Sequence, residues 1–346
     1  MGESYSKEEE ELFMADLFSL ALESGLMPDI DIDDSLTRYS GLNSTAILED
    51  YSSKLLTDAI GKAPNYVASL GAVIASFKGV PNAVGLGALI LSFILDLALL
   101  PSTMDSGDNT LNMMRRVFAE EKASGVRDIM DEYMKRLRMH MWEPLKALEE
   151  TEHWEKQLSD QLTRLRNSML HDDQMSTRAM KHWINGAAFH SQMLVHAARL
   201  KVAGSNSIQK DLKVRMSSIS TVTDIYQKDL QDLLEKYKKH KRSSIRLEKS
   251  LLPGAWCYRA CQLTHCIARD YEVGRMTPSI KHPVYGNQYC KNSLDAYLDY
   301  MFNNWNLVKK LNDYFSVLKG NLRELILQRQ AFNVLNISPD SSTAVD

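Results

Sequence analysis

The feature that most limits how this chain can fold is an apolar stretch from Tyr66 to Leu100. It contains only two charged residues, Lys78 and Asp96. Residues 78–82, Lys-Gly-Val-Pro-Asn, divide the stretch into two arms, because Pro81 cannot continue a helix that begins upstream. The pattern therefore predicts an apolar helical hairpin. Either the rest of the folded chain or a lipid bilayer must shield such a hairpin from water.

The two arms differ in how well they fit a membrane. The first arm has about a dozen residues and is too short to cross a bilayer, whereas the second, Ala83 to Leu100, is near the lower limit. Small residues four apart, Gly71 with Ala75 and Ala83 with Gly87, allow helix backbones to approach closely. The side chains expected to enter a membrane, if the hairpin inserts, are Val67, Leu70, Gly71, Val73, Ile74, Phe77, Val84, Gly87, Leu89, Ile90, Leu91, Phe93, Ile94 and Leu95.

The remaining composition is that of an ordinary globular protein. Charged residues make up 25% and apolar residues 44% of the 346 residues, and the net charge of -3 gives no sign of nucleic-acid binding. The N-terminus is acidic and has no apolar core, so we expect no secretory signal. We expect a cytoplasmic or membrane-associated location, with leaderless export left open.

Apolar residues recur three or four apart through most of the chain, which predicts an all-α fold. Pro144 should kink or split the long stripe in which it lies, and we find no convincing strand. We expect a single elongated bundle with long antiparallel helices and coiled-coil-like packing. Its expected parts are N-terminal helices (1–64), the apolar hairpin (65–101), a long helical pair (110–250), a Cys-containing irregular segment (251–292), a long C-terminal helix (293–333) and a disordered tail (334–346).

An acidic loop follows the first expected helix. Asp29, Asp31, Asp33 and Asp34 alternate as in a calcium loop, but the sixth position is Asp34 rather than Gly and the twelfth is Ser40 rather than Glu. An EF-hand needs that Gly for its turn and that Glu as a bidentate ligand. We therefore interpret the segment as a solvated loop.

The strongest basic cluster is Lys-Tyr-Lys-Lys-His-Lys-Arg-Ser-Ser-Ile-Arg, residues 236–246. One interpretation is a solvated helix end, where cations interact favourably with the helix dipole. The other is a landing patch for anionic lipid headgroups. The patch would consist of Lys236, Lys238, Lys239, Lys241 and Arg242.

All four cysteines, Cys257, Cys261, Cys266 and Cys290, lie in the irregular segment. No Cys-x2-Cys pair is present, so we expect no structural zinc site. Reduced buried thiols are the favoured interpretation, and one or two disulfides are the alternative if the protein leaves the cytosol.

Sequence motifs of catalysis are missing. The chain has no phosphate-binding loop, dinucleotide fingerprint, His-Glu-x-x-His or Gly-x-Ser-x-Gly. His182, His190 and His196 can share part of one helix face, but no carboxylate spacing typical of a di-metal bundle accompanies them. We therefore expect no enzyme, no cofactor and no metal.

The layout resembles that of the helical pore-forming toxins of the cytolysin A type. It is also similar to the fish rapunzel-like proteins, which carry a comparable Gly/Ala-rich apolar segment before long helices. Val67 to Leu97 carries the resemblance, which covers about residues 50–330. The resemblance implies an elongated bundle, a sheltered hairpin that enters membranes, and assembly into oligomers.

Three functions remain open. The first is a conditional membrane protein, pore formation included, that inserts residues 66–100, with membrane lipids and copies of itself as partners and no nucleic acid. The second is a soluble scaffold or interaction protein with the hairpin as permanent core. The third is a constitutive membrane protein anchored by the hairpin, which the cost of placing Asp96 in lipid disfavours.

Overall fold

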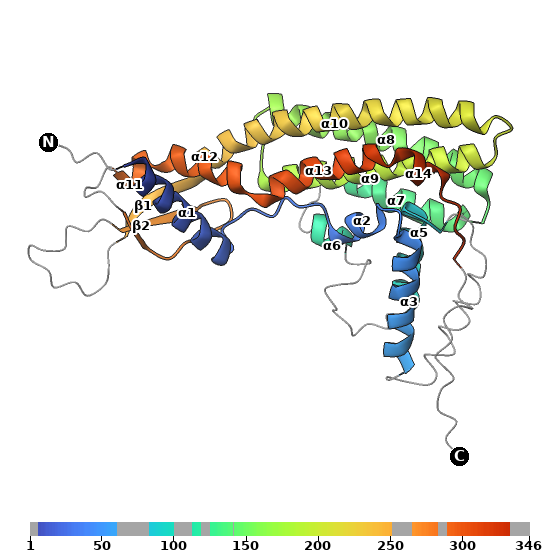
Figure 1. Cartoon of the computed structure of the whole chain (residues 1–346), viewed down its shortest axis with the longest axis horizontal. Coiled ribbons are helices and arrows are strands. Elements are labelled where there is room, and N and C mark those ends of the chain that lie inside the picture. Colours follow the sequence, from blue (N-terminus) through green and yellow to red (C-terminus); the bar gives the residue numbers. More distant parts are fainter. Residues whose placement is uncertain are drawn as a thin grey trace, which may run out of the picture. The chain divides into compact units, whose positions relative to one another are not determined.

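The computed structural model describes residues 6–60, 83–99, 113–118, 125–140, 142–250, 265–282 and 289–332. Within these ranges the chain is mostly helical, which confirms the predicted all-α class (Figure 1). The chain divides into two compact units. Unit 1 consists of Met1–Ile30, Asn167–Met180 and Leu230–Leu311, and unit 2 of Asp31–Arg166, Lys181–Asp229 and Asn312–Asp346.

In unit 1, α1 (Lys7–Glu23) begins with a capping box. The Ser6 Oγ accepts the Glu9 N–H at 3.2 Å, and the Glu9 carboxylate accepts the Ser6 N–H at 3.0 Å. The helix stops before Gly25, whose φ of 63° is costly for residues with a Cβ. It packs against α12 (Leu294–Asn304), where the buried Phe18 ring meets Tyr300 edge to face, with 5.9 Å between the ring centroids.

In unit 2, short helices surround the second arm of the predicted hairpin. The arm forms α5 (Leu86–Leu99), which packs against its neighbours α2 (Asp34–Tyr39), α3 (Ser44–Ile60) and α7 (Gly125–His140). A further short helix, α6 (Met113–Phe118), also contacts α7. An apolar core cluster connects the later helices of this unit and includes Val195, Leu212, Leu318 and Leu325.

Pro144 splits the long helical stripe, as predicted. Pro144 opens α8 (Pro144–His171) four residues after α7 stops at His140, because proline fits the first helical turn but not a helix interior. Asp173, with a φ of 54°, lies in the turn before α9 (Thr177–Ala203). After a break at Gly204, α10 (Ile208–Ser244) extends for 37 residues, a length of about 55 Å.

The expectation of no strand is wrong. In unit 1, β1 (Ile245–Ser250) pairs antiparallel with β2 (His265–Asp270), and Ile245 lies opposite Asp270. Two short strands, β3 (Arg275–Met276) and β4 (Ile280–Lys281), complete the sheet on β2. The buried face of β2 is formed by a Cys, an Ala and an Asp rather than by β-branched residues. β2 therefore leaves almost no strand pattern in the sequence, although β1 alternates the buried Ile245 and Leu247 with the charged Arg246 and Glu248.

The predicted single C-terminal helix, 293–333, is also wrong. After the short α11 (Tyr289–Asn292) come α12, α13 (Asn306–Gly320) and α14 (Leu322–Leu327). Trp305 breaks the chain between α12 and α13 in an extended conformation, with ψ of 104°. Asn303, Asn304 and Asn306 flank it, and asparagine favours helix ends over helix interiors. The near-heptad spacing thus continues across separate helices.

Cys266 of β2 and Cys290 of α11 form a disulfide. The favoured interpretation of four reduced thiols is therefore wrong for this pair. Cys257 and Cys261 lie outside the described residues.

Candidate functional site

The second arm of the predicted hairpin is part of the core of unit 2. From Ala83 to Asp96, every residue is buried except Phe93, which is half-buried. The predicted membrane-entering residues Val84, Gly87, Leu89, Ile90, Leu91, Ile94 and Leu95 all lie in this core. The first-arm residues Val67, Leu70, Gly71, Val73, Ile74 and Phe77 lie outside the described residues.

Polar contacts from α3 and from the segment after α14 hold the residues just before α5. The Ser44 Oγ accepts the Gly85 N–H at 2.7 Å, and the Thr45 Oγ1 donates to the Ala83 carbonyl at 3.0 Å. The Ala83 N–H donates to the Gln330 carbonyl at 3.1 Å. These bonds satisfy backbone groups that a helix N-terminus leaves unpaired.

Arg199 of α9 adds a cation to this region. Its side chain is buried, and its Nε and Nη2 both donate to the Leu325 carbonyl, at 3.1 and 2.7 Å. Its Nη1 donates to the Val84 carbonyl at 3.3 Å. Burial, and then the nearby Arg329, lowers the pKa of Arg199 to about 9, so the group remains charged at neutral pH. A carboxylate partner for Arg199 does not occur among the described residues.

Gly85 has no side chain, which allows the Arg199 guanidinium to lie beside the backbone at the start of α5. Its φ is 55°, and a Cβ built there would lie 3.3 Å from the Arg199 Nη2. A side chain at this position would therefore meet both backbone strain and the guanidinium.

Asp96, the one charged residue of α5, is bound within the protein. It is buried, and its carboxylate accepts a hydrogen bond from the hydroxyl of Tyr51 on α3. Burial, and then Asp96 itself, raises the pKa of Tyr51, which keeps the hydroxyl protonated as a donor. The most expensive group of the apolar arm thus has a partner in the folded chain.

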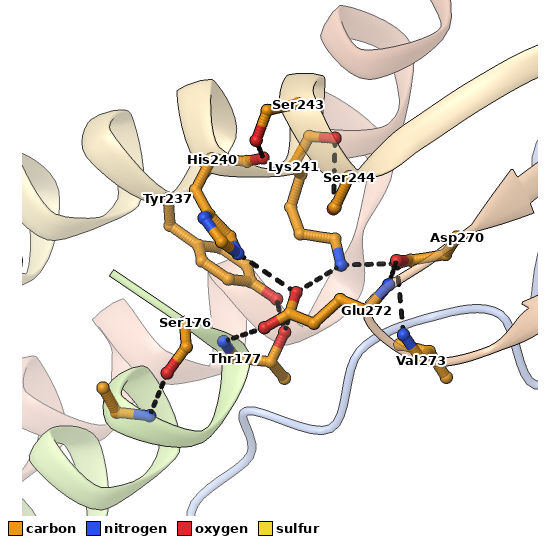
Figure 2. Close-up of polar contacts among 11 residues, drawn as sticks. Ser176, Thr177, Tyr237, His240, Lys241, Ser243, Ser244, Asp270, Glu272 and Val273 are labelled. Carbon is orange, nitrogen blue, oxygen red and sulfur yellow. Dashed lines mark hydrogen bonds and ion pairs between the residues drawn. The ribbon is translucent and has the colours of Figure 1, made fainter. Parts of the chain in front are cut away.

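In the basic cluster at the end of α10, Lys241 is not exposed as the predicted headgroup patch requires. Lys241 is fully buried and contacts the carboxylates of Asp270 and Glu272 (Figure 2). The assignment of Lys241 to an exposed patch is therefore wrong. Burial of an ammonium is tolerated here because two carboxylates surround it.

Most of the other patch residues also have acidic partners in unit 1. Lys236 pairs with Asp173 at 2.9 Å, Lys238 pairs with Asp299, and Arg242 forms a two-point contact with Asp295. Lys239 is exposed. The cluster is thus largely neutralised by carboxylates of neighbouring elements, which sequence spacing did not reveal.

Glu272 is the centre of the polar network in Figure 2. Its Oε1 accepts the Thr177 N–H at 2.7 Å, so the carboxylate caps the first turn of α9. Its Oε2 accepts from the Thr177 hydroxyl at 2.8 Å and contacts His240 and Lys241. Burial opposes ionisation, but the hydrogen bonds from His240, Thr177 and Lys241 outweigh it and lower the pKa of Glu272. The network joins α9, α10 and the β2–β3 turn.

The central helix α9 carries buried polar side chains that the sequence did not mark as important. Asn185 accepts the Asp33 N–H at 2.8 Å and donates to the Asp31 carbonyl at 2.9 Å. The Asp33 carboxylate binds Arg116 through two contacts of 2.8 and 2.9 Å. The interpretation of this acidic segment as a solvated loop is therefore wrong for Asp33, which is buried and paired.

The part of the chain that the structure describes holds neither a metal site nor a membrane span. Within the described ranges, no group of His, Cys, Asp and Glu side chains has an arrangement that could hold a metal ion. In the same ranges, no helix is both long enough and apolar enough to cross a bilayer. Comparison with known protein families, curated proteins and solved structures finds no match to this chain.

Proposed function

We propose that this chain is a helical scaffold or interaction protein in which α5 remains part of the folded core. The observation that carries the proposal is the buried guanidinium of Arg199, which binds the Val84 carbonyl at the start of α5. If α5 left the core, this charged group would lose an acceptor while the Leu325 carbonyl kept it in place.

The far end of α5 supports the same conclusion. Release of the helix would separate Asp96 from the Tyr51 hydroxyl, and would break the bonds of Ser44 and Thr45 to the segment before α5. Each buried polar group left without a partner costs about 1–3 kcal/mol. Lipid would replace the apolar contacts of α5 but not these polar contacts, so we infer that the folded position of α5 is favoured over exchange with lipid.

Hydrogen exchange measured with and without lipid vesicles tests the proposal. We expect the amides of α3 and α5 to keep the same protection in both conditions, and vesicles loaded with a fluorescent dye to remain sealed. Dye release together with faster exchange in α3, whose face α5 covers, would overturn the proposal.

A second candidate, conditional insertion of residues 66–100, is favoured by one observation. Apart from Ser92 and Asp96, the residues of α5 are apolar, and an α-helix satisfies its own backbone hydrogen bonds in core or lipid alike. A cysteine pair that replaces Thr45 and Ala83, which are in hydrogen-bond contact, would test it. Insertion requires that oxidation of this pair abolishes dye release and that a reductant restores it.

A further inference from the structure

We propose that Lys241 and Asp270 condense into an isopeptide bond between the Lys241 Nζ and the Asp270 Cγ, with Glu272 as the proton carrier. This modification goes beyond the scaffold function and does not depend on it. The ion pair in Figure 2 is the reactant state. Lys241 and Asp270 are fully buried and in direct contact, and Lys241 also donates to the Glu272 carboxylate at 2.9 Å. An amine, a carboxyl group and a second carboxylate are the groups that such a condensation needs.

The fold of unit 1 holds the amine against the carboxyl group. Lys241 lies in the last turn of α10, just before β1 begins at Ile245, and Ile245 lies opposite Asp270 in the sheet. The Tyr271 N–H donates to the Ser244 carbonyl at 2.9 Å, which ties the end of β2 to the end of α10. Well-oriented groups within one molecule reach effective concentrations on the order of 10⁵–10⁸ M, which favours a condensation that bulk water opposes.

The two carboxylate oxygens of Asp270 have different surroundings, and the difference suits acyl transfer. The Asp270 Oδ1 accepts the Glu272 N–H at 2.9 Å and the Val273 N–H at 3.4 Å (Figure 2). Backbone donors in this position stabilise the negative charge that develops on the oxygen when an amine adds to the carbon. The Oδ2 forms the ion pair with Lys241 and accepts no other hydrogen bond from the residues that the structure describes. Oδ2 is therefore the oxygen that leaves as water.

Burial of the pair favours the neutral groups that react. An ammonium is not a nucleophile and a carboxylate resists attack, but transfer of one proton from Lys241 to Asp270 gives an amine and an acid with no change in net charge. An interior shielded from water favours such a neutral pair more than bulk water does. Aromatic rings provide the shielding: Tyr237 and Tyr297 are fully buried, and the Lys241 Nζ lies 5.9 Å from the centroid of the Tyr237 ring.

Glu272 is placed to act as the base rather than as the acyl donor. Burial opposes its ionisation, but hydrogen bonds from His240, Thr177 and Lys241 lower its pKa. Glu272 therefore remains a carboxylate, which an amine does not attack, and its Oε2 already accepts a hydrogen bond from the Lys241 Nζ. The Glu272 side chain is 23% exposed whereas that of Lys241 is enclosed, so the released water has a way out beside Glu272.

The condensation needs no co-reactant. After the first proton transfer, the Lys241 Nζ adds to the Asp270 Cγ, and Oδ1 becomes an oxyanion. Glu272 takes a proton from the new N–C ammonium and delivers it to the Oδ2 hydroxyl. The Cγ–Oδ2 bond breaks, water leaves, and Oδ1 becomes the carbonyl oxygen of the amide. One N–C bond has replaced one C–O bond, and Glu272 is a carboxylate again.

The intact mass of the full chain, measured after reduction of its disulfides, tests the proposal. We expect the folded protein to be lighter than its sequence by one water molecule, and a tryptic digest to contain a branched peptide that joins Lys241 to Asp270. Chain recovered from insoluble aggregates in denaturant should have the full mass and should lose the water as it refolds. Full mass in the folded protein, or loss of water without the branched peptide, would overturn the proposal.

Three variants assign the roles of the side chains. Lys241→Arg keeps the cation but lacks the amine, and Glu272→Gln removes the carboxylate that carries the proton, so both should keep the full mass. Asp295→Asn is the matched control: it breaks the exposed pair with Arg242 in the same basic cluster and should lose one water as the unmodified chain does. A branched peptide in Glu272→Gln at the yield of the unmodified chain would contradict the role of Glu272. The mass of the unmodified chain decides whether the bond forms, so the test does not depend on the folding of the variants.

Discussion

Tyr226 of α10 and His190 of α9 form a buried hydrogen bond, with 2.8 Å between the hydroxyl oxygen and Nδ1. On the other side of the ring, the His190 Nε2 lies 3.1 Å from the Glu155 carboxylate of α8. Burial, and then the charges of Asp229 and Glu155, raises the pKa of Tyr226, so its hydroxyl is protonated. The simplest assignment has Tyr226 donating to Nδ1 and the Nε2–H donating to Glu155. One imidazole thus joins three helices of unit 2.

Removal of the Tyr226 hydroxyl should therefore destabilise unit 2. In Tyr226→Phe the buried Nδ1 of His190 loses its partner, and we expect the free energy of unfolding to fall by about 1–3 kcal/mol. Urea denaturation measures it. Tyr271→Phe is the control, because its hydroxyl bond to Glu248 is exposed and should contribute little. Equal effects of the two variants would contradict the prediction.

His196 should make stability depend on pH. Burial, and then the charge of Arg199, lowers the pKa of His196 to about 3, from an ordinary value of 6.5. Between these values the unfolded chain binds a proton that the folded chain does not, so stability falls as pH falls from 6.5 towards 3. At pH 4 the loss should be about 2–3 kcal/mol relative to pH 7. His196→Leu removes the titrating group, and a stability profile as steep as that of the unmodified chain would refute the assignment.

Glu272 and Asp295, two of the acidic residues paired with the end of α10, should differ sharply in their contribution to the free energy of unfolding. Glu272→Gln removes a charge from the buried side of Lys241, and we expect a loss of about 3 kcal/mol in the free energy of unfolding at neutral pH. Asp295→Asn breaks the exposed pair with Arg242 and should cost under about 1 kcal/mol. Because the pKa of Glu272 is lowered, its contribution is complete above 4.5 and is lost as pH falls below that value. Thermal or urea unfolding at neutral and acidic pH measures both variants, and a similar cost for the two would contradict the network in Figure 2.

The disulfide between Cys266 and Cys290 encloses a segment with a sequence separation of 24. In a digest without reductant, the peptides that contain these two residues should appear as one linked mass. Cys290→Ser should lower the free energy of unfolding by about 3 kcal/mol under oxidising conditions, since closure of a loop of this length restricts the unfolded chain. Free alkylation of both thiols in the purified, unreduced protein would be the contrary result.

Periodicity predicted the parts of this fold that local interactions determine. The split of the long helical stripe at Pro144 was predicted because proline acts on the backbone within a single turn, and the capping box at Ser6 and the stop at Gly25 are also set by neighbouring residues. The break at Trp305 was missed because the apolar spacing continues across it. The sheet was missed because β2 buries Cys266, Ala268 and Asp270 rather than β-branched residues, and the charge of Asp270 is neutralised by Lys241 only in the folded chain.

The candidate sites were harder to predict because their properties depend on residues distant in sequence. Lys241 looks like any other lysine of a basic cluster, and only the return of β2 places Asp270 beside it. Asp33 looks like a loop residue until Arg116 and Asn185 reach it. The apolar character of α5 was evident from sequence, whereas the polar contacts that hold it come from α3, α9 and the segment after α14.

The polar side chains of α9 also constrain how unit 2 can form during translation. Asn185 binds a residue 152 positions earlier in the chain, and Gln192 binds one 156 positions earlier. Arg199 binds the Leu325 carbonyl, 126 positions later. Asp33 and Leu36 therefore cannot form these hydrogen bonds until α9 has been synthesised, and Arg199 of α9 cannot bind Leu325 until α14 has been synthesised. The core of unit 2 is therefore complete only after α14 has been synthesised, so α5 is made long before several of the residues that hold it.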